Sequence, residues 1–257
     1  MQCYTHTLPG GASLVGYLRE ETTEMPAFNT RPAMLILPGG GYAYCSSREA
    51  DPVAMQFLQA GYNVFILYYT CRGQESQPAL RWQPLIDAAG AILHIRKNAV
   101  QFHIDPAKVA VCGFSAGGHL AASAATMLPE EVRPAFAVLI YPVITAESGK
   151  CHKGSFDHLL GTDRTAGDEA QWSLQNRVTA STPPTLLLLA DDDRTVPPVN
   201  STLFYEALKR NGVKGCSLRI YPSGGHGGGF NPDRIYRTAW RADVLDWLGT
   251  LPNSASH

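Results

Sequence analysis

Residues 108–125 read KVAVCGFSAGGHLAASAA and contain the pattern Gly-x-Ser-x-Gly centred on Ser115. The apolar residues before the pattern predict a short strand, and the small residues after it predict a helix. A serine on a sharp turn between a strand and a helix is held in strained backbone geometry, with its Oγ exposed above the sheet. Gly113 and Gly117 suit this turn, because a Cβ at either position would clash with the neighbouring strand or helix. The stretch therefore predicts a nucleophilic serine at the carboxyl end of a strand.

Alternating strands and helices extend in both directions from this turn. A Leu-Pro-Gly-Gly run at residues 8–11 predicts an N-terminal hairpin. Apolar runs predict strands at residues 33–37, 63–68, 108–112, 135–141, 185–190 and 217–221. Helices are expected at residues 50–60, 83–97, 116–127, 198–210 and 235–248. Because strands with both faces covered alternate with helices, we expect an α/β fold with a mostly parallel sheet of about eight strands and helices on both faces.

One segment interrupts the alternation. Residues 142–184 are polar in places and lack clear periodicity, apart from short helices expected at residues 155–160 and 168–176. A connection of this length in a compact domain is usually functional or covers a site. A chain of 257 residues is long enough for one large domain. We therefore expect a single domain over residues 1–257, with residues 142–184 as a cap-like insertion.

Composition argues against several classes of partner. The formal net charge is −1 and the sequence pI is about 6.7, so we expect neither a nucleic-acid nor a membrane partner. The six cysteines are scattered without metal-ligand spacing, and we expect no metal and no other cofactor. The first residues have no basic start and no apolar run of signal-peptide length, which predicts a cytoplasmic protein with reduced thiols. The sequence carries no signal for an oligomeric state.

A run of three glycines, residues 39–41, directly follows the strand expected at residues 33–37. Successive glycines allow backbone N–H groups to turn toward one point, as an acyl-transfer enzyme requires where negative charge develops on a carbonyl oxygen. A flexible turn and a phosphate-binding loop are the alternatives for such a run. No Gly-Lys-Ser/Thr follows it, and the Gly-x-Gly-x-x-Gly pattern of dinucleotide sites is absent. Together with the serine turn, the run favours an oxyanion-binding loop.

Two more segments follow strands and supply a possible acid and base. Residues 191–193 are three consecutive aspartates, any of which could orient a histidine. His226 lies among glycines after the last expected strand, where it has little to pack against. The competing His119 lies one turn beyond Ser115 and should point back into the fold. Because each segment follows its own strand, all of them could meet at the carboxyl edge of the sheet.

These motifs together resemble those of a known family, the bacterial α/β-hydrolase carboxylesterases. That family includes acetyl esterases, acetylxylan esterases and feruloyl-esterase-like proteins, some of which have xylanase B-like names. The similar motifs extend over nearly the whole chain after residue 30. They are PGGGY at residues 38–42, CGFSAGGHLA at 112–121, SFDHLLG at 155–161, PPT at 183–185, DRTVP at 193–197 and GHG at 225–227.

The resemblance implies an α/β-hydrolase fold and hydrolysis of carboxylic esters without a metal or organic cofactor. In the family the acid is the aspartate that begins Asp-x-x-Val-Pro, which corresponds to Asp193. The implied catalytic residues are then Ser115, Asp193 and His226, in the chain order of α/β-hydrolases. The implied oxyanion hole consists of the backbone N–H groups of Ala116, Gly40 and Gly41. The chain departs from many related esterases in having Pro38 where they have a histidine, but backbone donors do not require that histidine.

The expected partner is a small-molecule ester, including an acylated sugar. Aromatic residues near the glycine run, the serine and the insertion are candidates for contact with the acyl group: Tyr42, Tyr44, Tyr69, Phe114 and Phe156. The polar insertion at residues 142–184 lacks the clustered large aliphatic residues of an enzyme that acts on aggregated lipid. We therefore expect acetyl to butyryl esters, or acyl groups on a polar sugar.

Two other functions are compatible with the same residues. An amide hydrolase, either arylformamidase-like or a small peptidase, could use the same serine, aspartate and histidine. A catalytically silent hydrolase fold that only binds a ligand is the alternative from another class. The presence of nucleophile, acid, base and glycine run together argues against it, since a binding protein has no need of all four.

Overall fold

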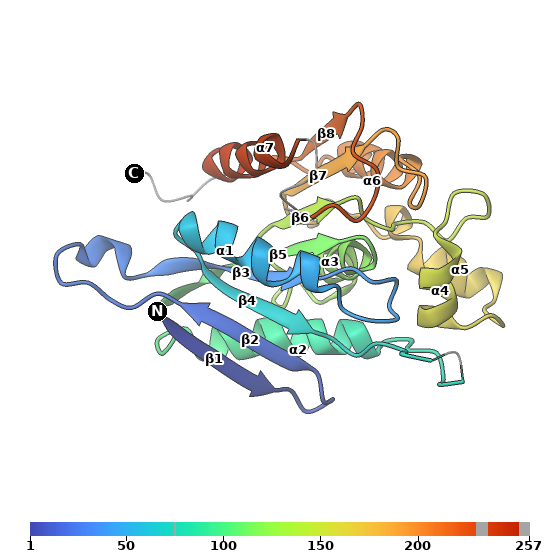
Figure 1. Cartoon of the computed structure of the whole chain (residues 1–257). Coiled ribbons are helices and arrows are strands. Elements are labelled where there is room, and N and C mark those ends of the chain that lie inside the picture. The colour runs from blue at the N-terminus through green and yellow to red at the C-terminus, as the bar shows by residue number, and fades with distance from the viewer. Residues whose placement is uncertain (75, 230–235, 252–257) are drawn as a thin grey trace.

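A computed structural model describes residues 1–257 except residues 75, 230–235 and 252–257. Its centre is an eight-stranded sheet in the order β1-β2-β4-β3-β5-β6-β7-β8 (Figure 1). The first two strands form an antiparallel hairpin that joins β4, and all later neighbours pair in parallel. The strands are β1 (Gln2–Thr7), β2 (Ser13–Leu18), β3 (Arg31–Leu37), β4 (Asn63–Tyr68), β5 (Ile104–Phe114), β6 (Ala137–Ile140), β7 (Thr185–Ala190) and β8 (Ser217–Tyr221).

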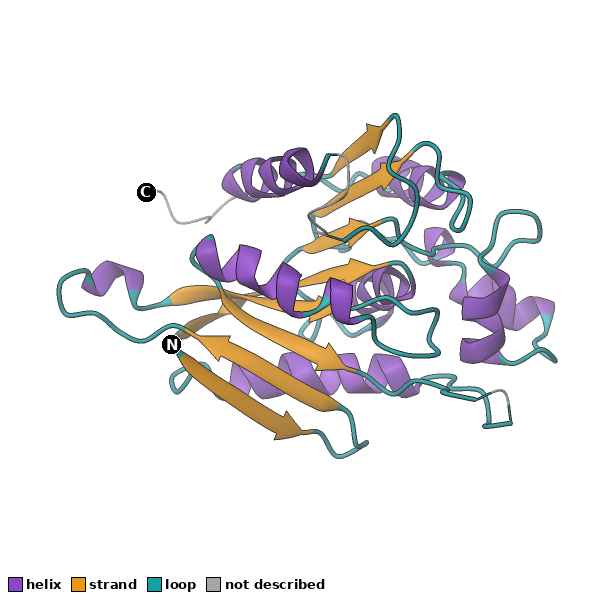
Figure 2. Ribbon diagram, viewed as in Figure 1, coloured by secondary structure: helices purple, strands orange, loops and turns teal. Residues whose placement is uncertain are grey.

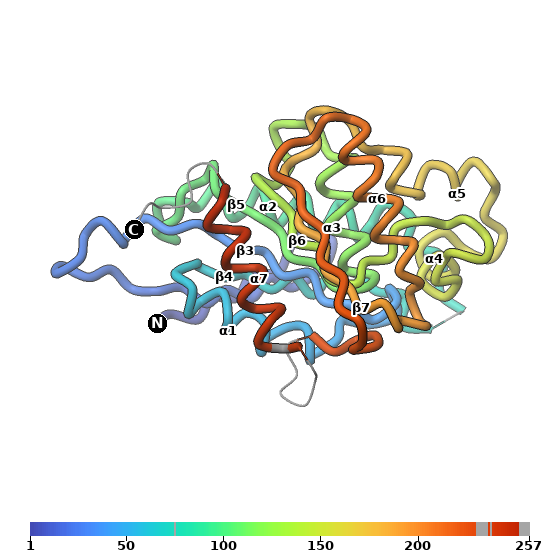
Figure 3. Tube along the Cα trace, turned by 90° about the horizontal axis from the view of Figure 1, so that it is seen from above, coloured from blue at the N-terminus to red at the C-terminus, as the bar shows by residue number. Residues whose placement is uncertain are grey.

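Helices cover both faces of this sheet (Figure 2). One face carries α2 (Gln83–Lys97), α3 (Ala116–Met127) and α6 (Val199–Arg210). The other carries α1 (Asp51–Gln59) and α7 (Arg237–Gly249), which lie on the same side of the strands when seen from above (Figure 3). The expected mostly parallel α/β sheet is therefore confirmed.

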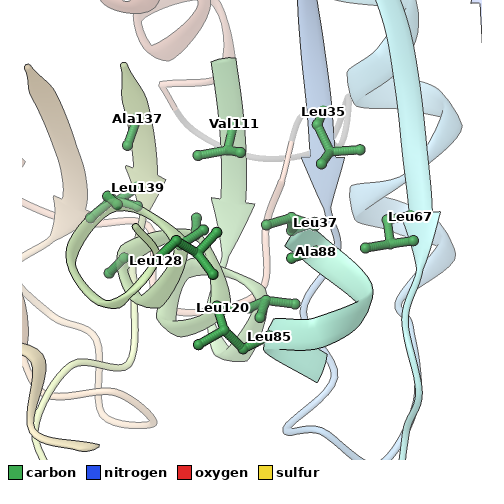
Figure 4. Packing of buried hydrophobic residues seen from close by; sticks show 14 of the residues in the cluster. Leu35, Leu37, Leu67, Leu85, Ala88, Val111, Leu120, Leu128, Ala137 and Leu139 are labelled. Atoms are coloured by element: carbon green, nitrogen blue, oxygen red, sulfur yellow. The ribbon is translucent and has the colours of Figure 1, made fainter. Parts of the chain in front are cut away.

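The alternation of side chains along the central strands divides the core into two layers. In β3, Leu35 and Leu37 pack with α2 and α3, whereas Met34 and Ile36 pack with α1 and α7. Successive residues of a strand point to opposite faces, so a strand covered on both sides must be apolar throughout. Figure 4 shows the first layer, where Leu120 of α3 lies beneath the sheet. Both layers fix the position of the strand ends.

Boundaries differ from those predicted where local hydrogen bonds decide them. The helix expected at residues 168–176 is instead α5 (Ala166–Trp172) followed by a separate 3-10 turn, Leu174–Asn176. Thr165 accepts a hydrogen bond from the N–H of Asp168, whose carboxylate accepts one back from the N–H of Thr165. This capping box starts the helix at residue 166. The predicted start of the last helix, residue 235, lies outside the described residues.

The insertion at residues 142–184 contains α4 (Lys153–Leu160) and α5, which lie together at one end of the sheet (Figure 1). His158 of α4 contacts the carbonyl oxygen of Gly41 through Nδ1 at 2.9 Å. The insertion therefore touches the glycine run after β3. Among the described residues, no helix is both long and apolar enough to cross a bilayer.

Candidate active site

Ser115 lies between β5 and α3 in a conformation that few residues other than glycine adopt, with φ 52° and ψ −118°. Both flanking glycines are required by close backbone packing. A Cβ on Gly113 would lie 2.2 Å from the carbonyl oxygen of Gly117, and one on Gly117 would lie 2.1 Å from that of Leu37. The serine side chain is more enclosed than predicted, because the residue is only 7% exposed. It nevertheless lines a cavity at the carboxyl end of the sheet.

The structure brings the three predicted residues together. His226 lies between the other two, with Nε2 at 2.8 Å from Ser115 Oγ and Nδ1 at 2.6 Å from Asp193 Oδ2. The second carboxylate oxygen of Asp193 accepts hydrogen bonds from the N–H groups of Thr195 and Val196, at 2.9 and 3.0 Å. These donors hold the carboxylate in one orientation. The arrangement is a continuous chain from a buried carboxylate through an imidazole to a hydroxyl.

The three consecutive aspartates have different environments. Asp193 is 4% exposed, whereas Asp191 and Asp192 are on the surface. Asp192 accepts a hydrogen bond from the N–H of Gly225 at 2.8 Å, so it supports the loop that carries His226 without contacting the imidazole. Only Asp193 among them is placed to orient that ring.

The glycine run forms a tight turn beside Ser115. Gly40 and Gly41 have φ values of 126° and 64°, and a Cβ on Gly40 would lie 2.0 Å from the carbonyl oxygen of Tyr44. Both glycines line the cavity. Within the part of the chain that the structure describes, no hydrogen bond uses the N–H of Gly40, Gly41 or Ala116. Ala116 is the first residue of α3, where a helix leaves its N–H groups without internal partners.

The cavity has a volume of about 300 Å³, and several polar side chains contribute to its lining. Beside Ser115, His226 and the two glycines, the lining includes Tyr44, Arg48, His152, His158 and Thr195. Of the aromatic residues expected to contact an acyl group, only Tyr44 is on this lining. The others are buried in the core, where no surface remains for a substrate: Tyr42, Tyr69, Phe114 and Phe156. We therefore no longer regard those four as substrate contacts.

Sequence reasoning missed the polar residues of the lining. His158 lies within SFDHLLG, one of the motifs that carried the resemblance, but its role as a contact of the glycine run was not apparent. Arg48 and Glu49 lie eight and nine residues beyond Gly40, in a stretch without a recognisable pattern. Their approach to the site depends on a short 3-10 helix, Ser47–Glu49, that folds back beside the serine.

His119 does not take part in this arrangement. Its side chain is fully buried and points into the fold, as predicted, with Nε2 at 3.0 Å from the carbonyl oxygen of Trp172 and Nδ1 at 2.9 Å from the hydroxyl of Tyr42. Because the carbonyl can only accept, Nε2 carries the proton and the tyrosine donates to Nδ1. Burial lowers the pKa of His119 to about 4, so the ring is neutral near pH 7.

Among the described residues, no three histidine, cysteine, aspartate or glutamate side chains are placed to hold a metal ion.

Comparisons with known proteins agree with the fold. The model of the prolyl oligopeptidase family, Peptidase_S9, matches residues 87–253, and a second family model, BD-FAE, matches residues 23–134. An acetylxylan esterase of Xylanibacter ruminicola is 36% identical over 224 residues, which are 86% of this chain and 46% of that relative. An endo-1,4-beta-xylanase B of Butyrivibrio fibrisolvens is 38% identical over 209 residues, covering 77% of this chain and 32% of the relative. The chain thus spans less than half the length of these curated relatives.

Solved structures match over nearly the whole chain. The crystal structure of an acetyl ester-xyloside bifunctional hydrolase from Caldicellulosiruptor lactoaceticus has a TM-score of 0.83 and 33% identity, covering 94% of this chain and 88% of that one. A sugar hydrolase from Lactococcus lactis has a TM-score of 0.84 and 29% identity, covering 96% and 97%. The first family model covers about two thirds of this chain, and the first of these structures is an ester hydrolase. The chain therefore belongs to the prolyl oligopeptidase family and has an α/β-hydrolase fold.

Proposed function

We propose that the chain is a serine hydrolase of carboxylic esters, with Ser115 as nucleophile, His226 as general base and acid, and Asp193 as the orienting carboxylate. The observation that carries the proposal is the position of His226, within hydrogen-bond distance of both Ser115 Oγ and Asp193 Oδ2. This is the geometry that a nucleophile, its base and the partner of that base require.

The reaction has two similar halves. His226 Nε2 takes the proton of Ser115 as Oγ attacks the acyl carbon, and then gives that proton to the departing alcohol. Water next attacks the acyl-enzyme, loses a proton to Nε2, and releases the acid while Oγ regains a proton. Asp193 holds Nδ1–H throughout, which keeps the correct tautomer and stabilises the imidazolium.

Backbone donors complete the site. In this proposal the N–H groups of Ala116, Gly40 and Gly41 bind the carbonyl oxygen of the ester, since Gly40 and Gly41 line the cavity and Ala116 directly follows Ser115 at the start of α3. Negative charge on that oxygen in the tetrahedral intermediate is stabilised by such fixed donors, each worth about 10²- to 10³-fold in kcat.

The cavity offers partners for a polar alcohol. Arg48, His152, His158 and Thr195 on its lining can form hydrogen bonds with hydroxyl groups. The names of two relatives, an acetylxylan esterase and an acetyl ester-xyloside hydrolase, are consistent with this chemistry. The proposed substrate is an acetyl to butyryl ester, including one on a sugar.

Labelling tests the nucleophile. A fluorophosphonate probe should modify wild-type protein at Ser115, identified by peptide mapping, and Ser115→Ala should be neither labelled nor active, with a loss of up to about a millionfold. A catalytically silent binding protein would stay unlabelled. If Ser115→Ala retained more than a few per cent of the wild-type rate, this serine would not be the nucleophile.

A series of p-nitrophenyl esters with two to twelve acyl carbons tests the substrate class. Because each CH₂ buried in an acyl pocket is worth roughly 0.8 kcal/mol, a long apolar pocket would favour long chains steeply. We expect kcat/KM to be highest at two to four carbons and acetylated xylo-oligosaccharides to be cleaved. A maximum at eight carbons or more would contradict the short-acyl proposal.

The match to the prolyl oligopeptidase family favours one second candidate, hydrolysis of an amide or peptide by the same residues. Matched pairs of substrates, an ester and an amide with the same acyl group, distinguish the two functions. Ester cleavage should exceed amide cleavage by a large factor. The reverse order with N-formyl aryl amides or aminoacyl anilides would favour the second candidate.

A further inference from the structure

A buried carboxylate with no part in the proposed chemistry lies beside the site. Glu49 is 2% exposed and is the last residue of the 3-10 helix before α1. Its Oε2 accepts a hydrogen bond from the N–H of Gly39 at 2.7 Å, and its Oε1 accepts one from the hydroxyl of Tyr141 at 2.7 Å. Burying a carboxylate is costly unless it is well paired. A glutamate at this place therefore calls for an explanation.

The two donors belong to different parts of the site. Gly39 is the first glycine of the run, next to Gly40, whose N–H is proposed to bind the oxyanion. Tyr141 directly follows β6, and its hydroxyl accepts a hydrogen bond from the N–H of Gly229 at 2.7 Å. Gly229 lies three residues beyond His226. One carboxylate thus connects the glycine run after β3 with the histidine loop after β8.

The packing around this connection is tight. The ring of Tyr141 lies against the imidazole of His226, with ring centres 4.7 Å apart. A Cβ on Gly39 would lie 2.5 Å from Glu49 Oε2, and one on Gly229 would lie 3.4 Å from Glu49 Cγ. Tyr141 itself has a φ of 38°, which is unusual for a residue other than glycine. Both loops are therefore built closely around the same carboxylate.

The hydrogen bonds around Glu49 suit an ionised carboxylate. The tyrosine oxygen accepts from Gly229, so its own proton is free to be donated to Glu49, and Gly39 donates to the other oxygen. Both carboxylate oxygens then act as acceptors, as an ionised carboxylate requires. Burial is the largest effect and keeps the pKa of Glu49 above its ordinary value, although the hydrogen bonds from Tyr141 and Gly39 and the nearby His226 act in the opposite direction.

We propose that Glu49 is a positioning residue for ester hydrolysis: it fixes the oxyanion-binding loop and the His226 loop relative to each other, and it places a negative charge near the imidazolium that forms during the reaction. This inference rests on the proposed roles of Ser115 and His226. In this role Glu49 acts through Gly39 and Tyr141.

Glu49→Gln removes the negative charge of the side chain while preserving its shape. The amide oxygen can still accept from Gly39, and the amide nitrogen can donate to the Tyr141 oxygen. We expect kcat to fall by about 10- to 100-fold, since small misplacements of catalytic groups have effects of this size, with KM within about twofold. Labelling of Ser115 by the fluorophosphonate should slow by a similar factor.

The pH dependence of kcat/KM distinguishes a positioning role of Glu49 from a merely structural one. The charged or titratable groups around His226 are Asp193, Glu49, Arg48, His152 and Tyr141. Glu49→Gln alters only one of them, and the loss of a negative charge makes the imidazolium less favourable. The acidic limb of the kcat/KM profile should therefore move to lower pH in this variant. Tyr141→Phe removes the link to Gly229, and its effect should be strongly non-additive with that of Glu49→Gln if the two act as a unit.

Asp87→Asn is the matched control. Asp87 is also 2% exposed and accepts two hydrogen bonds, from the N–H of Thr70 and from Gln83 Nε2, both at 2.8 Å. It lies in α2, away from the cavity lining. A loss that arises only from disturbing a buried carboxylate would appear equally in Asp87→Asn, with a lower Tm and an unchanged pH profile.

The outcomes distinguish this inference from the proposed function. Wild-type protein that is not labelled at Ser115 would overturn the proposed function itself. Labelled wild-type protein together with Glu49→Gln at wild-type kcat and an unshifted acidic limb would overturn only the role of Glu49. The same conclusion would follow from additive effects of Glu49→Gln and Tyr141→Phe. If Glu49→Gln does not fold, the kcat and the Ser115 labelling rate of Tyr141→Phe test the role of Glu49, with Asp87→Asn again as the control.

Discussion

At the scale of single residues, the run of three aspartates gives a sharp test, because the three carboxylates differ only in their contacts. Asp193→Asn removes the carboxylate that holds His226 Nδ1–H, and the amide favours the wrong tautomer. We expect a loss of about a thousandfold or more in kcat/KM. Circular dichroism should remain as in the wild type, because the substitution preserves the shape of the side chain.

Its neighbours are the internal controls. Asp192→Asn retains an oxygen that can accept from Gly225 N–H, and Asp191 is exposed, so both variants should keep kcat/KM within about threefold. A greater loss at Asp192 than at Asp193 would refute the assignment of the acid.

Residue identities were predictable where chemistry leaves few choices. The glycines around Ser115 and His226 predict their places beside the cavity, because a strained turn and an uncrowded histidine both leave a pattern in sequence. The residues alone do not choose among residues 191–193, and the prediction of Asp193 needs the family resemblance. Four of the five aromatic candidates are buried, because whether Tyr42 or Tyr44 faces the cavity depends on the turn at Gly40 and Gly41, which no periodicity reveals.

At the scale of elements, two helical glycines should respond in opposite ways to alanine. Gly117 in α3 approaches the backbone of β3, where a Cβ would meet the carbonyl oxygens of Leu37 and Pro38 at 2.1 and 2.4 Å. The backbone of β3 and Pro38 cannot shift easily. Gly117→Ala should therefore lower the free energy of unfolding by roughly 3 kcal/mol or more and displace Ser115. Thermal denaturation and ester hydrolysis should both show the damage.

Gly90 in α2 is the matched control, because a Cβ there would be in ordinary contact, 3.8 Å from Leu8 Cδ2. Alanine is favoured over glycine in a helix by about 1 kcal/mol, so Gly90→Ala should raise Tm by roughly 2–4 °C. Equal responses at the two positions would show that close approach of α3 to β3 is not what excludes a side chain at Gly117.

Elements were predicted well because both signals that define them are local. Continuous apolar runs gave the parallel strands, and glycine and proline marked their ends. Boundaries failed where a hydrogen bond between side chain and backbone decides them, as with Thr165 at the start of α5. The bridge from Glu49 through Tyr141 to Gly229 joins positions up to 180 residues apart, so local sequence patterns carried no trace of it.

At the scale of the whole molecule, His119 connects the catalytic elements to the insertion. It extends from α3, contacts Tyr42 directly after the glycine run, and contacts the carbonyl of Trp172 at the end of α5. The ring is neutral in the folded state, because burial lowers its pKa from 6.5 to about 4. Protonation of His119 would therefore disturb α3, the turn at Tyr42 and the end of α5 together.

This arrangement predicts how stability depends on pH. Between pH 6.5 and 4 the unfolded chain binds a proton at residue 119 that the folded protein does not, so the free energy of unfolding must fall as the pH falls through that range. From pH 7 to 5 the expected loss is about 2 kcal/mol from this residue. Above pH 7 both states are neutral at residue 119, and its contribution no longer changes.

Urea denaturation of the wild type and of His119→Gln at pH 7 and pH 5 isolates this contribution. The pKa values of His94 and His152 are also lowered by burial and add to the same trend, but they are common to both proteins and cancel in the comparison. His119→Gln should be less stable at pH 7, because glutamine cannot reproduce both hydrogen bonds, and its stability should change less between the two pH values by about 2 kcal/mol. Parallel losses in the two proteins would mean that His119 is protonated within the fold without penalty. The contacts of His119 with Tyr42 and Trp172 would then tolerate a charged ring, although all three side chains are buried.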